Sequence, residues 1–152
     1  QCTELCGKDH GFMPVVVEVK SKEDFTKWLA ERKQAALAEK ELTSKVWTLD
    51  ELTARGEKAY QTNCASCHQT NGEGLPPMFP PLKGSKIATG PADGHIGIVV
   101  NGKAGTAMAA FGKQLSEVDI AAIIPYERNA WGNKVGDMVT PKDIVAFKKA
   151  QE

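Results

Sequence analysis

The sequence predicts an all-α fold, with one short strand near its N-terminus, from three observations. Three segments carry apolar residues at helical spacing, and each follows a residue that can cap a helix: Ser21, Thr48 and Ser116. Between the last two segments, residues 69–107 hold eight of the fourteen glycines and five of the eight prolines, a composition that favours loops. A packed domain can carry such a stretch when it wraps a rigid group.

The N-terminal part predicts one strand and one helix. Residues 15–19 are short and rich in β-branched valine, which predicts a strand. Asp24 lies three residues after Ser21, a loose capping box that predicts a helix over residues 22–42. Its apolar residues are few and its charges many, so we expect an exposed amphipathic helix that links two units; the apolar positions are Phe25, Trp28, Leu29 and Ala36.

The second and third helices have clear starts. Thr48 and Glu51 form a capping box before the second helix. Ser116 caps the third, which contains Pro125, and a proline inside a helix removes a hydrogen bond at a cost of about 3 kcal/mol. We therefore expect that helix to kink or to begin later. Residues 132–152 are expected to form a tail with a last helical turn.

Composition limits the classes of function. Nineteen basic and nineteen acidic residues cancel in a chain of 152 residues, so charge gives no reason to expect nucleic acid as a partner. No run of about 18 apolar residues occurs, so we expect no membrane insertion by this chain.

The motif Cys64-Ala65-Ser66-Cys67-His68 carries the most specific chemistry. Two thiols spaced C-x-x-C and followed at once by histidine are the attachment pattern of c-type haem, in which both thiols add to haem vinyl groups and the histidine lies under the iron. A zinc site or a redox dithiol is the alternative. The sixth iron ligand would be one of three methionines, because a thioether favours ferrous iron: Met78, Met108 or Met138.

Residues 46–131 resemble a class I cytochrome c domain. The resemblance rests on the capped helix, the C-A-S-C-H motif, a proline-rich loop, a methionine about 40 residues later and a final helix with aromatic residues. It implies that Met108 is the sixth ligand, because its small-residue loop precedes the third helix. It also implies that the carbonyl of Pro80, in a P-x-L-x-G stretch, accepts from His68, and that Gly56 and Tyr126 lie where the two helices cross. His95 has no place in this scheme and is expected to be an exposed loop residue.

A second motif near the N-terminus contains soft metal ligands. Two cysteines four residues apart, then a histidine and a methionine, resemble the binuclear copper A loop of cytochrome c oxidase subunit II. The resemblance implies that Cys2 and Cys6 bridge two coppers, that His10 and Met13 bind through side chains, and Glu4 through its carbonyl. That family needs a further histidine upstream, which this chain lacks. We therefore predict that residues 1–13 hold no native copper A centre here.

Together the two resemblances imply the C-terminal part of an oxidase subunit II with a fused cytochrome c. The expected division is a cupredoxin remnant (1–20), a linker helix (21–45), the cytochrome c domain (46–131) and a tail (132–152). The chain would receive electrons from a soluble or membrane-bound donor at the periplasmic face of the bacterial inner membrane. It would pass them to copper A and then to subunit I, where oxygen is reduced.

The sequence leaves three alternatives to the oxidase function. A free-standing periplasmic electron shuttle would share every haem argument but leave residues 2–13 unexplained. A haem enzyme such as a peroxidase would need an open iron position, and thus Met108 away from the iron. Nitrous oxide reductase also has copper A, but its loop carries aromatic residues between the two cysteines, where this chain has Thr3, Glu4 and Leu5.

Overall fold

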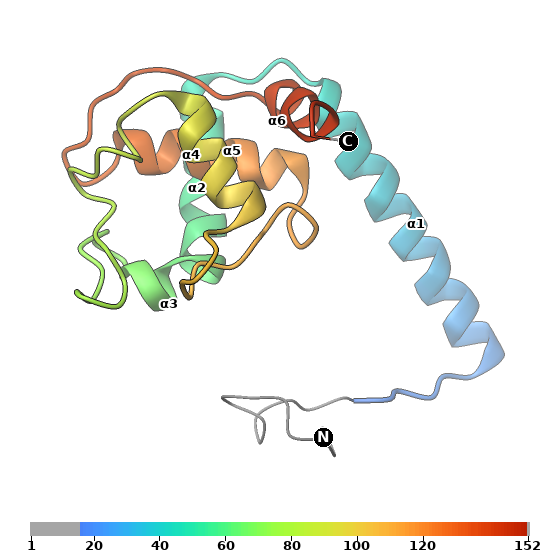
Figure 1. The fold of residues 1–152 in the computed structure, drawn as a ribbon. Helices are drawn as coiled ribbons and strands as arrows, with labels where there is room; N and C mark the ends of the chain where they lie inside the picture. The colour runs from blue at the N-terminus through green and yellow to red at the C-terminus, as the bar shows by residue number, and fades with distance from the viewer. Residues whose placement is uncertain (1–15, 152) are drawn as a thin grey trace. The chain divides into compact units, whose positions relative to one another are not determined.

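The computed structural model describes residues 16–151, which form six helices and no strand (Figure 1). The helices are α1 (Lys22–Ser44), α2 (Leu49–Asn63), α3 (Ala65–His68), α4 (Ala92–Asn101), α5 (Glu117–Asn129) and α6 (Pro141–Lys149). The predicted all-α class is confirmed. The chain divides into two compact units, residues 1–37 and 38–152, so the division lies within α1. No helix among the described residues is both long and apolar enough to cross a membrane.

The described part of the first unit is exposed. The α1 helix begins after Ser21, whose hydroxyl accepts from the Asp24 backbone N–H at 3.1 Å, and it buries no residue along its length, as expected for residues 22–42. The predicted strand is wrong over its described residues, because Val16, Val17 and Val19 are exposed and irregular. A lone strand is not stable by itself, and no other part of residues 16–151 pairs with it. The copper A motif lies outside the described residues.

In the second unit, α2 packs most extensively against α5. The α2 helix starts as predicted, with both hydrogen bonds of the Thr48–Glu51 capping box present. The two backbones meet at Gly56, where an added Cβ would lie 2.1 Å from the carbonyl oxygen of Ala122 and 2.8 Å from Cβ of Tyr126. The predicted approach of Gly56 and Tyr126 is confirmed. Glycine is required because any side chain here would overlap the backbone of α5.

The core lies between α4, α5 and α6. Residues 69–107 were expected to lack long regular structure, yet they contain the ten-residue helix α4. Two glycines weaken its helical propensity, and burial of its apolar face outweighs that loss. The nine-residue α6 also belongs to this packing, so residues 132–152 form more than a tail. The buried cluster consists of Ile96, Val99, Val100, Ile120, Ala121, Ile124, Val139 and Ile144.

Pro125 lies inside α5 without delaying its start. The helix begins after Ser116, which accepts from the Asp119 N–H at 3.1 Å, and it continues through Pro125 to Asn129. Pro125 is fully buried, so the packing of its ring offsets part of the lost hydrogen bond.

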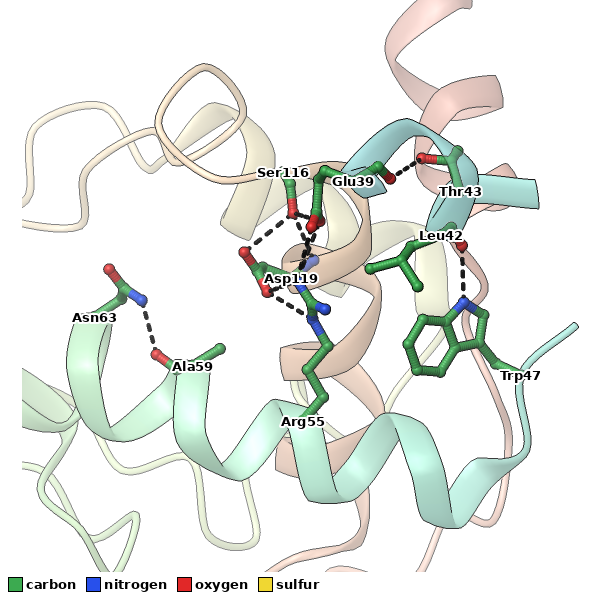
Figure 2. Close-up of polar contacts among 9 residues, drawn as sticks. All are labelled: Glu39, Leu42, Thr43, Trp47, Arg55, Ala59, Asn63, Ser116 and Asp119. Carbon is green, nitrogen blue, oxygen red and sulfur yellow. Dashed lines mark hydrogen bonds and ion pairs between the residues drawn. The ribbon is translucent and has the colours of Figure 1, made fainter. Parts of the chain in front are cut away.

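The last turns of α1 are joined to α2 and α5 by a polar network, which Figure 2 shows. Arg55 donates to Asp119 at 2.8 Å and to Glu39 at 3.1 Å, and the Ser116 hydroxyl donates to the same Glu39 carboxylate at 2.6 Å. Trp47 adds a bond from its indole N–H to the Leu42 carbonyl at 3.0 Å. This network explains why the compact unit begins within α1 rather than after it.

Candidate functional site

The turn from α2 into α3 presents both thiols and the imidazole of the predicted motif. The backbone N–H groups of Cys67 and His68 both bond to the Cys64 carbonyl, at 3.2 and 2.9 Å, so the three residues occupy one helical turn. Both cysteines are free and partly buried. Burial, followed by the charge of Glu127 and the neighbouring Cys67, raises the pKa of the Cys64 thiol. One short helix therefore supplies two thiols and one imidazole to the same region.

The orientation of His68 is set by the loop that follows α3. Its Nδ1 lies 2.9 Å from the carbonyl oxygen of Pro80, the atom that the sequence analysis expected to accept this bond. Because a carbonyl can only accept, Nδ1 carries the proton and Nε2 keeps its lone pair for a metal. Gly74 allows this loop to close, since a Cβ there would lie 2.7 Å from the Pro80 oxygen.

An aromatic cluster of Tyr60, Tyr126 and Trp131 holds the residues that directly follow the C-x-x-C-H turn. Tyr60 is fully buried, and its hydroxyl donates to the Gln69 carbonyl at 2.6 Å, directly after His68. Its ring packs against Tyr126 and Trp131, with ring centres 5.4 and 5.0 Å away. The Trp131 indole N–H donates to the Thr70 carbonyl at 3.0 Å. Tyr60 in α2 and Trp131, just after α5, thus fix the two residues that follow His68.

The three methionines differ in exposure. Met108 is partly buried in the loop between α4 and α5, whereas Met78 and Met138 are 66% and 41% exposed. The Met108 carbonyl accepts from the Lys103 N–H at 3.1 Å, and its own N–H donates to the Thr106 hydroxyl at 3.2 Å. Of the three, Met108 has the most enclosed and most constrained position.

His95 and Glu127 form a buried pair in which one residue contradicts its expected position and the other was not singled out. His95 lies in α4 and is 2% exposed, so its interpretation as an exposed loop residue is wrong. Its Nε2 lies 2.7 Å from Oε2 of Glu127, which sequence reasoning did not single out. A signal was present, because Glu127 falls three residues after Ile124 and seven after Ile120, on the buried face of α5.

Asn133, also missed, connects the end of α5 to the loop that carries Pro80. Its amide donates to the carbonyls of Glu127 and Leu82 at 2.7 and 3.2 Å, and its side-chain oxygen accepts from the Gly84 N–H at 2.8 Å. No pattern in the sequence indicates this bridge, because its partners are up to 51 residues away.

The donor set fits a covalent haem c. Two thiols on one turn, an imidazole with a free Nε2 and a thioether in a constrained loop are the groups that haem attachment and axial ligation need. Large apolar side chains between α3 and α4 are also exposed and could pack on such a group: Leu75, Met78 and Ile87.

The fold and this turn define the class of protein. A capped helix that crosses the last aromatic helix at a glycine, with C-x-x-C-H directly after it, is a class I cytochrome c domain. Residues 51–126, half of the chain, match the family described as Cytochrome C oxidase, cbb3-type, subunit III, and the chain belongs to this family. A cytochrome c domain implies covalent haem c and electron transfer.

Curated relatives fall into two groups. The chain is 30% identical to the cytochrome c subunit of a quinone alcohol dehydrogenase from Gluconacetobacter polyoxogenes, over 61% of this chain and 22% of that protein. It is 30% identical to the gluconate 2-dehydrogenase cytochrome c subunit of Pantoea cypripedii, over 75% and 31%. A probable cytochrome c oxidase subunit 2 from Rickettsia felis is 57% identical, over 24% and 12%. The chain thus spans less than a third of each of these relatives.

Proposed function

We propose that Cys64 and Cys67 hold the haem through thioether bonds, and that His68 and Met108 bind its iron. The observation that carries this proposal is the contact between His68 Nδ1 and the Pro80 carbonyl, which leaves Nε2 free beside the two thiols. The bound haem would supply the iron that alternates between the ferrous and ferric states. The chain would supply both axial ligands, fix the imidazole orientation and exclude water from the iron.

Haem attachment can be tested with a double variant. We expect the chain, produced in a host that matures c-type cytochromes, to give a c-type pyridine haemochrome spectrum and to keep its haem in a denaturing gel. Cys64→Ser with Cys67→Ser should lose all covalent haem, because no thioether bond can form. Ser66→Ala, between the two cysteines, is the matched control and should keep it. A wild-type chain without c-type haem would contradict the proposal.

We further propose that this haem passes electrons to the copper A centre of a haem-copper oxidase, at the periplasmic face of the membrane. Two findings support this assignment. The spacing from Cys2 to Met13 is that of a copper A loop, and a probable subunit 2 relative is 57% identical over 37 residues. The motif would then belong to the parent subunit, and the expectation that residues 1–13 hold no copper A centre in this chain remains a prediction.

A second candidate is an electron carrier outside an oxidase, either as a free periplasmic shuttle or as part of a dehydrogenase. It is favoured by the longer matches, which reach 135 residues, to dehydrogenase cytochrome subunits. Purification of the native protein from its membranes, through an affinity tag, would separate the two. The oxidase assignment predicts that haem a and copper copurify with it and that the complex consumes oxygen. Copurification with a dehydrogenase, or with no partner, would contradict it.

A further inference from the structure

A buried acid and a buried histidine form a pair that haem attachment does not use. His95 in α4 and Glu127 in α5 are 2% and 3% exposed, and their side chains meet at 2.7 Å. Glutamate is almost never buried to this extent unless it is paired. The pair therefore needs an explanation beyond the general packing of α4 on α5.

The surroundings of the second ring nitrogen of His95, Nδ1, indicate which of the two side chains is charged. Nδ1 of His95 is buried and has no hydrogen-bond partner among the described residues. A charged imidazole would place an unpaired N–H there, whereas a neutral one places only a lone pair, and buried N–H groups without an acceptor are the rarer case. His95 is therefore neutral and donates through Nε2, so Glu127 accepts as a carboxylate. The pair carries one buried negative charge.

The groups around this charge do not neutralise it. Tyr60 and Tyr126 are phenols whose pKa is raised, mainly by burial, so both are uncharged at neutral pH. Arg128 is the adjacent cation, but its guanidinium donates to both Asp137 carboxylate oxygens, at 2.7 and 2.6 Å. An arginine in a two-pronged bond with another carboxylate is already compensated.

The charge lies close to the haem attachment site. The Glu127 backbone carbonyl accepts from the Asn133 amide at 2.7 Å, and the same amide donates to the Leu82 carbonyl at 3.2 Å, two residues after the Pro80 that contacts His68. Burial, followed by the charge of Glu127, also raises the pKa of the Cys64 thiol and of the Tyr60 hydroxyl. A ferric haem held at Cys64 would carry a positive charge that ferrous haem lacks. A buried negative charge in this part of the domain stabilises the ferric state, because low-dielectric surroundings screen it poorly.

We propose that the Glu127 carboxylate, oriented by His95, lowers the reduction potential of the haem bound by this chain. The inference rests on the proposed haem site. Glu127 acts through space on the iron, and His95 is a positioning residue whose Nε2–H holds the carboxylate in place. Reduction then transfers one electron to the iron against this fixed charge, with no bond made or broken.

The decisive variant is Glu127→Gln, which keeps the shape and removes the charge. Spectroelectrochemical titration of the haem-loaded chain at pH 7 should give a higher reduction potential than wild type, with the reduction equilibrium shifted about tenfold toward ferrous haem. A purely structural role predicts the opposite sign, because loosened packing admits water, which stabilises ferric haem. An unchanged or lower potential in Glu127→Gln would overturn the inference.

Variants of His95 test the same charge without altering Glu127. His95→Gln retains an N–H donor and should stay near the wild-type potential. His95→Leu removes the donor that holds the carboxylate in place, so the potential should rise toward that of Glu127→Gln. If Glu127→Gln does not hold haem, the His95→Leu result decides, and an unchanged or lower potential there overturns the inference.

Glu73→Gln is the matched control, because Glu73 is an exposed carboxylate that lies five residues after His68 and pairs with Lys83. Its removal should leave the potential unchanged, since solvent screens an exposed charge; a shift as large as that of Glu127→Gln would overturn the role of the buried charge.

A haemochrome assay on the wild-type chain separates the two proposals. Absence of c-type haem would reject the haem site itself, whereas bound haem with an insensitive potential would reject only the role of Glu127.

Discussion

Met108→Ala should lower the reduction potential of the haem and open one axial position on its iron. A thioether stabilises ferrous iron, and its loss leaves that position to water or to nothing. Because axial ligands set haem potentials over a range of about 0.8 V, we expect a decrease on the order of a tenth of a volt. Ferrous Met108→Ala should also bind carbon monoxide, which the wild-type chain with both positions filled should resist.

Met78 and Met138, the two exposed methionines, are the matched controls for this experiment. Met78→Ala and Met138→Ala remove thioethers that are 66% and 41% exposed, and both variants should keep the wild-type potential and the long-wavelength absorption band of methionine-ligated ferric haem. If Met78→Ala loses that band while Met108→Ala keeps it, the assignment of the sixth ligand is wrong. If the wild-type chain itself binds carbon monoxide readily, a haem enzyme with an open iron position becomes the better interpretation.

The sequence predicts correctly the features that depend on residues close together in the chain. The capping box at Thr48 and the cap at Ser116 depend on residues three positions apart, and the helices begin where those pairs predict. The C-x-x-C-H turn is local in the same sense. Pro80 follows His68 by only 12 residues, in the loop after α3, and its carbonyl oxygen contacts His68 Nδ1 as expected.

Features that depend on distant partners could not be predicted in this way. His95 is buried because Glu127, 32 residues later, accepts its N–H, and nothing next to His95 indicates that partner. The α4 helix forms despite Gly94 and Gly97, because tertiary burial outweighs a propensity loss of about 1 kcal/mol for each glycine. No strand forms over residues 16–19, the described part of the strand predicted there, for the complementary reason: its β propensity is high, but the rest of the described chain offers it no partner.

Gly56→Ala should destabilise the domain strongly, although alanine is the better helix former. In an open helix this substitution would add about 1 kcal/mol of stability. At Gly56 the new Cβ would lie 2.1 Å from the Ala122 carbonyl oxygen and 2.6 Å from its carbonyl carbon, and these are backbone atoms that cannot rotate away. The helices α2 and α5 would have to separate, at a cost we expect to be about 3 kcal/mol or more. Denaturant unfolding of the haem-loaded chain, followed by circular dichroism, measures it.

Gly94→Ala separates the close approach from the general effect of removing a glycine. Gly94 also lies within a helix, α4, but beyond its chain neighbours and its own helix backbone no heavy atom lies within 4 Å of its added Cβ. This variant should therefore be as stable as wild type or more stable by up to about 1 kcal/mol. Equal stability of Gly56→Ala and wild type would show that the two helices do not need their contact at this position.

Because Tyr60 lies one turn after Gly56 and donates to the chain beside His68, separation of the helices should also loosen the haem site. We therefore expect Gly56→Ala to lower the haem potential together with the stability, whereas Gly94→Ala should change neither in that direction.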